Sequence, residues 1–146
     1  MIYFTSNFGI DFIKSFESFS PIVYICPGGV RTIGYGHVLT QSEYYSRISQ
    51  IDAEELLKRD LAYIERSVIR NISGYLKQNQ FDALVSFTFN VGSGALQRSR
   101  LRQKINYGSS MDEISEEFLS WVYAQGRKLP GLVRRRIFEA RIYCGK

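Results

Sequence analysis

Three residues near the start of the chain have the types and the spacing of an active site: Glu17, Cys26 and Thr32. Phenylalanine and isoleucine recur at three- and four-residue steps before Glu17, which predicts an amphipathic helix, and Pro21 stops that helix. The unpaired carbonyls at a helix C-terminus disfavour a second negative charge, so Glu17 is placed where a carboxylic acid tends to keep its proton. Such an acid can protonate the leaving oxygen when a glycosidic bond is cleaved. Taken alone, a glutamate at a helix end is more often a solvated surface residue.

A β-hairpin is predicted directly after Glu17. Residues 22–35 contain two runs of strand-forming residues joined by the turn sequence Cys-Pro-Gly-Gly. The period of two puts Thr32, Gly34 and Gly36 on one face of the returning strand. A face with one hydroxyl and two glycines would let a bulky ligand approach the backbone, and Thr32 could hold a water or a ligand hydroxyl there. The alternative is a strand that glycine weakens at a bend.

The rest of the chain is predicted to be helical. Apolar residues recur at steps of four, three and four over residues 52–70, which predicts one long helix, and residues 71–74 interrupt it. A strongly apolar helix runs from Phe81 to near Gly92 and forms the core of a large lobe. The remaining predicted helices are 99–106, 111–123 and 133–143. With 146 residues and 45% hydrophobic content, the chain can bury the core of one domain, or of two lobes that share a helix.

The hairpin residues resemble a known family. Phe16-Glu17, Cys26 and the run Thr32-Ile33-Gly34-Tyr35-Gly36-His37 resemble the Glu, Asp-or-Cys, Thr signature of the phage-type lysozymes, the endolysins of T-even and lambdoid bacteriophages. Later segments, around residues 56–61, 83–92 and 121–139, resemble the family's linking helix, its buried central helix and its C-terminal region. The resemblance therefore covers nearly the whole chain, and its first block is the specific one.

The resemblance implies an α+β, mostly helical, lysozyme-like fold. It predicts a small N-terminal lobe over about 1–50, with a β-hairpin or a short three-stranded sheet. A linking helix over about 52–70 would join this lobe to a helical lobe over about 75–146. Residues 1–146 would then form a single lysozyme-like domain.

The resemblance also implies a muramidase, which cuts the β-1,4 bond between N-acetylmuramic acid and N-acetylglucosamine in peptidoglycan, with inversion. Glu17 would be the general acid. In most of the family an aspartate, with the threonine, positions or activates the attacking water, and this chain has Cys26 there. Two carboxylates are the usual requirement for glycoside hydrolysis. We hypothesise that Cys26 replaces the aspartate without becoming a glycosyl carrier, provided that its pKa lies below the reference of about 8.5.

Four further residues are expected to bind substrate: Tyr24, Gly34, Asn90 and Arg135. The Asn90 amide offers a donor and an acceptor to sugar hydroxyls and acetamido groups, although it could equally cap a helix. The resemblance places one arginine of the run 134–136 near Glu17, and Arg135 is our choice. A nearby cation would favour the charged form of Glu17, against the effect of the helix end. No cofactor and no metal site is expected.

Three other functions stay open. Cys26 and His37 could form a nucleophile and base for acyl transfer, although a lone histidine is more often a packed structural residue. A lytic transglycosylase also uses one dominant acid and leaves an anhydro end. A non-catalytic module that binds the cell wall is the third alternative.

The charge distribution favours a partner in the bacterial wall. The net charge is +5, and residues 98–146 hold eleven basic and five acidic residues against eight and nine in residues 1–97. Wall polymers are anionic, and no zinc-ligand spacing or other nucleic-acid-binding motif supports a nucleic-acid partner. We expect a monomer with free thiols at Cys26 and Cys144, no signal peptide and no membrane insertion. Such a protein would stay in the host cytoplasm until a separate holin releases it to the wall.

Overall fold

A computed structural model describes residues 3–146 of the chain. Helix α1 (Asn7–Phe16) leads into an antiparallel sheet, in which β1 (Ser20–Ile25), β2 (Arg31–Gly34) and β3 (His37–Val38) lie in that order. The later elements are α2 (Gln50–Asn71), α3 (Gln78–Val91), α4 (Ser93–Arg98), α5 (Arg100–Tyr107), α6 (Met111–Leu119), β4 (Tyr123–Ala124), β5 (Arg127–Lys128) and α7 (Pro130–Cys144). The predicted α+β, mostly helical fold is thereby confirmed.

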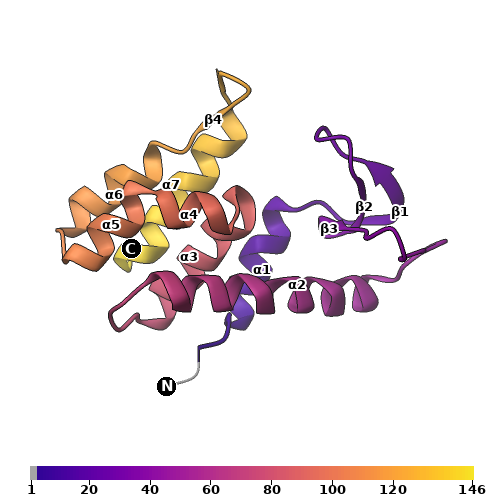
Figure 1. Ribbon diagram of the computed structural model, residues 1–146, viewed down its shortest axis with the longest axis horizontal. Helices are drawn as coiled ribbons and strands as arrows, with labels where there is room; N and C mark the ends of the chain where they lie inside the picture. The colour runs from indigo at the N-terminus through magenta and orange to yellow at the C-terminus, as the bar shows by residue number, and fades with distance from the viewer. Residues whose placement is uncertain (1–2) are drawn as a thin grey trace.

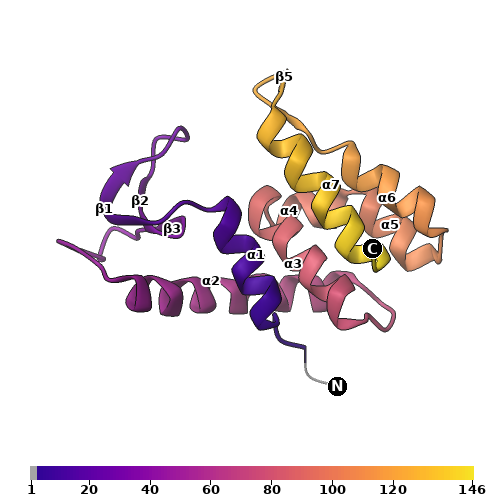
Figure 2. The same ribbon diagram turned by 180° about the vertical axis from the view of Figure 1, so that it is seen from behind.

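The long helix α2 joins two parts of the molecule. One end carries the three-stranded sheet and the other end lies beneath the helices α3 to α7 (Figure 1). Seen from behind, α1 crosses α2 between the sheet and these helices (Figure 2). The helix begins at Gln50, two residues before the predicted start, because the side chain of Ser49 caps it by accepting a hydrogen bond from the amide of Asp52 at 3.1 Å. Within the described residues, no helix is long and apolar enough to cross a membrane.

Helix α3 is the centre of the helical part. Its residues from Gln80 to Thr88 are all buried, and it packs against α7, α2 and α1. The rings of Phe118 and Trp121 meet the ring of Phe87 edge-on, at centroid distances of 5.6 and 5.5 Å. A strongly apolar helix is typically buried, so this run of the sequence correctly predicted the core.

The predicted helix 111–123 is wrong in its last four residues, 120–123. Helix α6 ends at Leu119, and Tyr123–Ala124 pairs instead with Arg127–Lys128. The turn between these strands has positive φ angles at Gln125 (52°) and Gly126 (77°), which suit a tight hairpin. Helix α7 then starts at Pro130, three residues before the predicted 133, because proline fits the first position of a helix.

The returning strand of the hairpin does not have the open face that its glycines suggested. Strands β1 and β2 pair as predicted, with Tyr24 opposite Thr32. However, Thr32 is only 3% exposed, and Gly34 is buried as well. A side chain at Gly34 would approach the Cβ atom of Ala53 to 3.1 Å, so this glycine lets α2 pack closely on the strand.

His37 connects the three-stranded sheet to helix α2 by a hydrogen bond. Its Nδ1 atom lies 2.9 Å from a carboxylate oxygen of Asp60 in α2, and its Nε2 atom lies 2.9 Å from Glu43. Burial disfavours the charged ring, yet the two carboxylates raise the pKa of His37 above its usual value. The amide of Thr40, followed by His37, lowers the pKa of Glu43 to about 2.

These contacts predict a pH-dependent stability. A raised histidine pKa adds stability that is complete below the unfolded pKa of about 6.5 and is lost as pH rises through the folded value. The lowered pKa of Glu43 acts on the acid side, where its stabilisation disappears as pH falls from 4.5 towards about 2. In urea titrations, wild type should therefore lose its stability advantage over His37→Gln as pH rises above neutrality. A difference that is constant from weakly acid to alkaline pH would contradict this prediction.

Candidate active site

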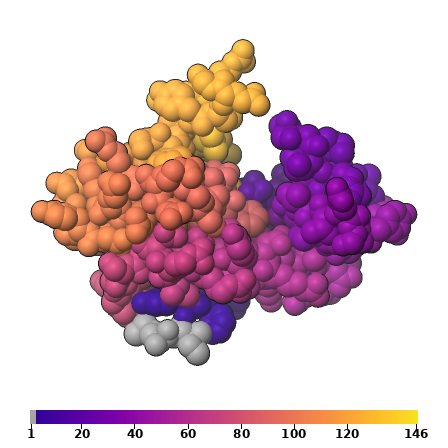
Figure 3. All heavy atoms as spheres, in the orientation of Figure 1, coloured from indigo at the N-terminus to yellow at the C-terminus, as the bar shows by residue number. Residues whose placement is uncertain are grey.

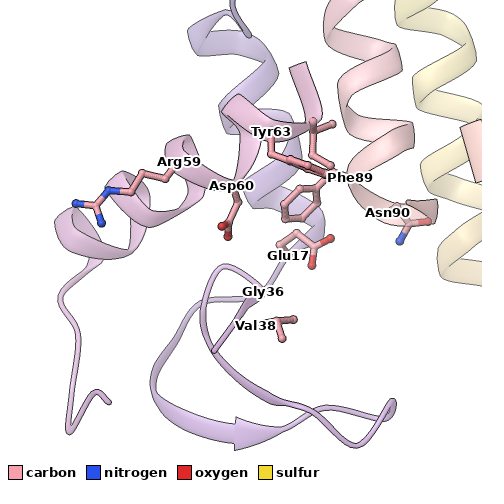
Figure 4. Close-up of a pocket in the computed structure, with 9 residues that line it drawn as sticks. Glu17, Gly36, Val38, Arg59, Asp60, Tyr63, Phe89 and Asn90 are labelled. Carbon is pink, nitrogen blue, oxygen red and sulfur yellow. The ribbon is translucent and has the colours of Figure 1, made fainter. Parts of the chain in front are cut away.

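Glu17 lies where two cavities meet. The space-filling view shows a hollow between the N-terminal lobe and the helical lobe (Figure 3). One cavity of about 680 Å³ is lined by Glu17, Gly36, Val38, Arg59, Asp60, Tyr63, Ile64, Phe89 and Asn90 (Figure 4). A second, of about 640 Å³, is lined by Ser15, Phe16, Glu17, Ser18, Asn90, Leu129, Pro130, Gly131, Leu132, Arg134 and Arg135. A polymer bound across both cavities would therefore pass directly over the Glu17 carboxylate.

The end of α1 positions this carboxylate. Glu17 has left the helical conformation, with φ −98° and ψ 105°, while its amide still donates to the carbonyl of Ile13 at 2.9 Å. It thus occupies the C-cap position that the sequence predicted. Its side chain is 24% exposed, so the acid can be reached from the cleft while its direction is fixed.

Arg135 is the arginine that approaches Glu17, as predicted. Its Nη1 atom donates to Glu17 Oε1 at 2.9 Å, and its guanidinium lies 5.4 Å from the centre of the Phe16 ring. Its remaining nitrogens donate to Glu139 at 3.2 Å and to the carbonyl of Ser86 at 3.2 Å. Arg135 is therefore held from several sides and presents one fixed donor to Glu17.

A buried ion network lies behind this pair. Glu139 and Arg136 are fully buried and paired with each other, and Ser86 Oγ donates to Glu139 at 2.6 Å. Arg136 also donates to the backbone carbonyl of Trp121 at 2.9 Å and to the side-chain oxygen of Asn90. Burial lowers the pKa of Arg136, and Glu139 opposes that effect.

Replacing Arg136 should strongly destabilise the protein. The Arg136→Met variant leaves the buried Glu139 with one cation fewer and the Trp121 carbonyl without its donor. Removing one partner of a buried ion pair costs about 3–5 kcal/mol. Urea denaturation should show a loss of this size, whereas Arg141→Met, on an exposed position of the same helix, should change stability by less than about 0.5 kcal/mol. Equal effects of the two substitutions would contradict the prediction.

Asn90 touches both cavities. It is the next-to-last residue of α3, and its side-chain oxygen accepts from Arg136. This contact uses the side-chain oxygen, and Asn90 lines both cavities together with Glu17 (Figure 4). The alternative role as a helix cap is not found, because Gly92 caps α3 with its amide bonded to the carbonyl of Thr88 at 2.8 Å.

Cys26 and Thr32 are brought together by the hairpin. The amide of Val30, followed by the Thr32 hydroxyl and the amides of Gly28 and Gly29, lowers the pKa of the Cys26 thiol, although burial opposes this. Thr32 Oγ1 also donates to the carbonyl of Val30 at 3.1 Å. The turn thus favours the thiolate form that the sequence hypothesis requires.

Tyr24 lies on β1 between the acid and the thiol. Its pKa is raised, first by burial and then by electrostatic interaction with Cys26 and with Glu17. Its ring is 39% exposed. Tyr24 therefore lies close enough to both Glu17 and Cys26 to interact electrostatically with each of them.

Gly36, rather than Gly34, is the glycine next to the acid. Its φ angle is +80°, and a Cβ atom there would lie 3.3 Å from Glu17 Oε2. A side chain at this position would press on the carboxylate and would also be strained. Gly34 lines neither cavity beside Glu17, so its contact with substrate stays a prediction.

Sequence reasoning missed the contribution of α2 and α3 to the cleft. Asp60 and Tyr63 lie on the linking helix and Phe89 on α3, and all three line the larger cavity, while Arg59 extends away from Glu17 (Figure 4). A partial signal was present, because residues 59, 60 and 63 share one side of the helix, next to its apolar positions.

The structure gives no support to a Cys–His pair. Both ring nitrogens of His37 lie within 2.9 Å of carboxylates, so neither is free to take the Cys26 proton. Cys26 and Cys144 are both free thiols. In the part of the chain that the structure describes, no three metal-ligating side chains gather into a possible metal site.

Comparison with known proteins identifies the family. The phage lysozyme family model matches residues 14–139. The chain is 39% identical over 140 residues to the endolysin of Bacillus phage B103, which covers 94% of this chain and 53%, about half, of that protein. It is 35% identical over 142 residues to the endolysin of Acyrthosiphon pisum secondary endosymbiont phage 1, covering 94% and 96% of the two chains. Among solved structures, the muramidase domain of SpmX from Asticaccaulis excentricus superposes with a TM-score of 0.88 at 34% identity, over 97% and 98% of the two chains. The chain therefore belongs to the phage lysozyme family.

Proposed function

We propose that this chain is a peptidoglycan hydrolase of the endolysin type, which cleaves the β-1,4 bond between N-acetylmuramic acid and N-acetylglucosamine. The observation that carries the proposal is the position of Glu17 at the junction of two cavities, from which a glycan strand can extend in both directions. Membership of the phage lysozyme family supports the same reaction.

In the proposed reaction Glu17 protonates the oxygen of the leaving sugar. Asn90 holds the substrate at the point where the two cavities meet, and Arg135 fixes the direction of the acid. The Cys26 thiolate, supported by Thr32, polarises the attacking water from the hairpin side and stabilises positive charge on the sugar. Tyr24 and the backbone at Gly34 complete the substrate-binding surface on that side.

Hydrolysis with inversion is the outcome that we propose. It requires room for a water between the acid and the second group, and in inverting enzymes these groups lie about 6.5–9.5 Å apart. The lowered pKa of Cys26 supports a hydrolytic role, because a thiolate can hold and activate water. Cys26 itself forms no bond to the sugar, so no covalent adduct accumulates.

Digestion of purified peptidoglycan sacculi by the reduced protein tests the proposal. The released muropeptides, weighed by mass spectrometry, should carry reducing muramic ends. Products one water lighter would show a lytic transglycosylase, and the absence of any product would favour a wall-binding module. The intact mass of the protein should be unchanged after turnover.

The setting of the reaction is part of the same proposal. Residues 1–146 act as one lysozyme-like domain and as a monomer. The protein stays in the host cytoplasm until a holin opens a route to the wall. Its basic C-terminal third, residues 98–146, then favours the anionic polymers found there.

A further inference from the structure

The carboxylate of Glu139 has no role in the proposed reaction, although it accepts a hydrogen bond from Arg135, the residue that pairs with Glu17. It lies on α7, is fully buried and accepts hydrogen bonds from three side chains: Arg135, Arg136 and Ser86. Arg135 in turn donates to Glu17. A chain of alternating charges therefore runs from the cleft into the core.

This alternation of charges matters because the Glu17 carboxyl has to be protonated when the substrate binds. A lone guanidinium 2.9 Å from its carboxylate would stabilise the ionised form. Glu139 lies at a similar distance from the same guanidinium, 3.2 Å, and it is buried, where charges are screened less than in water. Its negative charge offsets that of Arg135, and its hydrogen bond to Nε directs Nη1 towards Glu17.

We propose that Glu139 is a positioning residue that acts through Arg135 and sets the pH range over which Glu17 can donate its proton. The proposal rests on the proposed hydrolase function for its activity readout. The charged groups that meet in this cluster are Glu17 from the end of α1 and Arg135, Arg136 and Glu139 from α7. Across the cleft, Tyr24 of β1 interacts electrostatically with Glu17 and Asp60 of α2 lines the same cavity, and the Glu139 variants keep both. Helix α3 contributes only neutral partners, Ser86 and Asn90.

The pH dependence of Glu139→Gln tests this role. Glutamine keeps the shape but removes the charge, so Arg135 is left with Glu17 as its only carboxylate. The limb of the activity profile that follows Glu17 should move to lower pH by about 1–3 units, the range for a close opposite charge, and the NMR midpoint of Glu17 identifies that limb. A residue with a merely structural role would lower the rate equally at every pH, and that result would overturn the proposal.

A double substitution that removes both buried charges tests the same prediction without leaving one of them unpaired. Arg136→Met/Glu139→Gln removes one buried charge of each sign and keeps the pair of Arg135 with Glu17, so the same displacement of the limb that follows Glu17 is expected. Glu116→Gln, an exposed substitution with the same charge change on α6, should leave the profile in place. An unshifted double variant that is folded would also overturn the proposal.

A second readout needs no substrate. Carbon-13 NMR of labelled glutamate carboxyls follows the titration of Glu17 directly, with Glu17→Gln used to assign its signal. The Glu17 midpoint should move down in both Glu139 variants and stay in place in Glu116→Gln. If wild type hydrolyses nothing, the proposed function fails, yet the NMR titration still decides the role of Glu139.

Discussion

Replacing Glu17 by glutamine is expected to slow peptidoglycan hydrolysis by about 10²- to 10⁴-fold, the contribution of a well-placed general acid. Glutamine has nearly the same size, and its oxygen can still accept the bond that Arg135 donates at 2.9 Å. The variant therefore keeps the geometry of the site and loses only the proton. Substrate binding should be retained, because the two cavities that Glu17 joins keep their other walls.

The measurement is the initial rate of muropeptide release from sacculi, beside a sedimentation assay for binding to the same sacculi. Glu55→Gln is a matched control, since the Glu55 side chain is 61% exposed on α2 and forms an ion pair with Lys58 at 3.6 Å. Thermal unfolding checks that all three proteins are folded. A Glu17→Gln protein that retains more than a tenth of the wild-type rate would remove Glu17 from the role of acid.

Helices could be predicted from the sequence where a periodic pattern of apolar residues extends over several turns. The linking helix α2 and the central helix α3 were predicted because each buries a face or a whole surface over several turns. Strands β4 and β5 were missed, since two residues each are too short to show a period. Helix α4 has only six residues and was missed for a similar reason.

In the candidate site, too, some features could be predicted from the sequence and others could not. The placement of Glu17 at the end of α1 and the approach of Arg135 to it were predicted, the first from helix patterning and the second from the family resemblance. The open face at Thr32 was wrong, because alternation along a strand cannot show that a helix such as α2 packs against it. The buried carboxylate of Glu139 was unpredictable for a related reason: charged residues are mostly exposed, and only the fold reveals the cations that permit its burial.

The second large effect is expected at Cys26. Removing the thiol in Cys26→Ala should lower the rate by about 10²-fold or more, because the attacking water loses the group that polarises it. Cys26→Asp should keep activity, since the carboxylate restores the negative charge that most of the family has at this place. Cys26→Ser should resemble Cys26→Ala near neutral pH, because a hydroxyl carries no charge there.

The pH dependence of the hydrolysis rate shows whether residue 26 acts through its charge or only through its shape. The reaction needs the thiolate of residue 26 and the protonated form of Glu17 together, and in wild type the Val30 amide and then the Thr32 hydroxyl lower the pKa of the thiol. In Cys26→Asp the pKa of residue 26 should move towards the reference value of aspartate, about 3.9, so the limb that follows residue 26 should move to lower pH while the limb that follows Glu17 stays in place. A thiol-alkylating reagent should inactivate wild type and spare Cys26→Asp, in which only the distant Cys144 remains.

Two results would exclude this role for the thiolate. An unimpaired Cys26→Ala would show that the water is activated elsewhere, with the buried Thr32 as the next candidate. A pH profile that is identical in wild type and Cys26→Asp would show that the ionisation of residue 26 does not limit the reaction. If instead the limb moves as expected, the hairpin has a chemical function: its turn amides stabilise an anion opposite Glu17, and a thiolate can then serve in place of a second carboxylate.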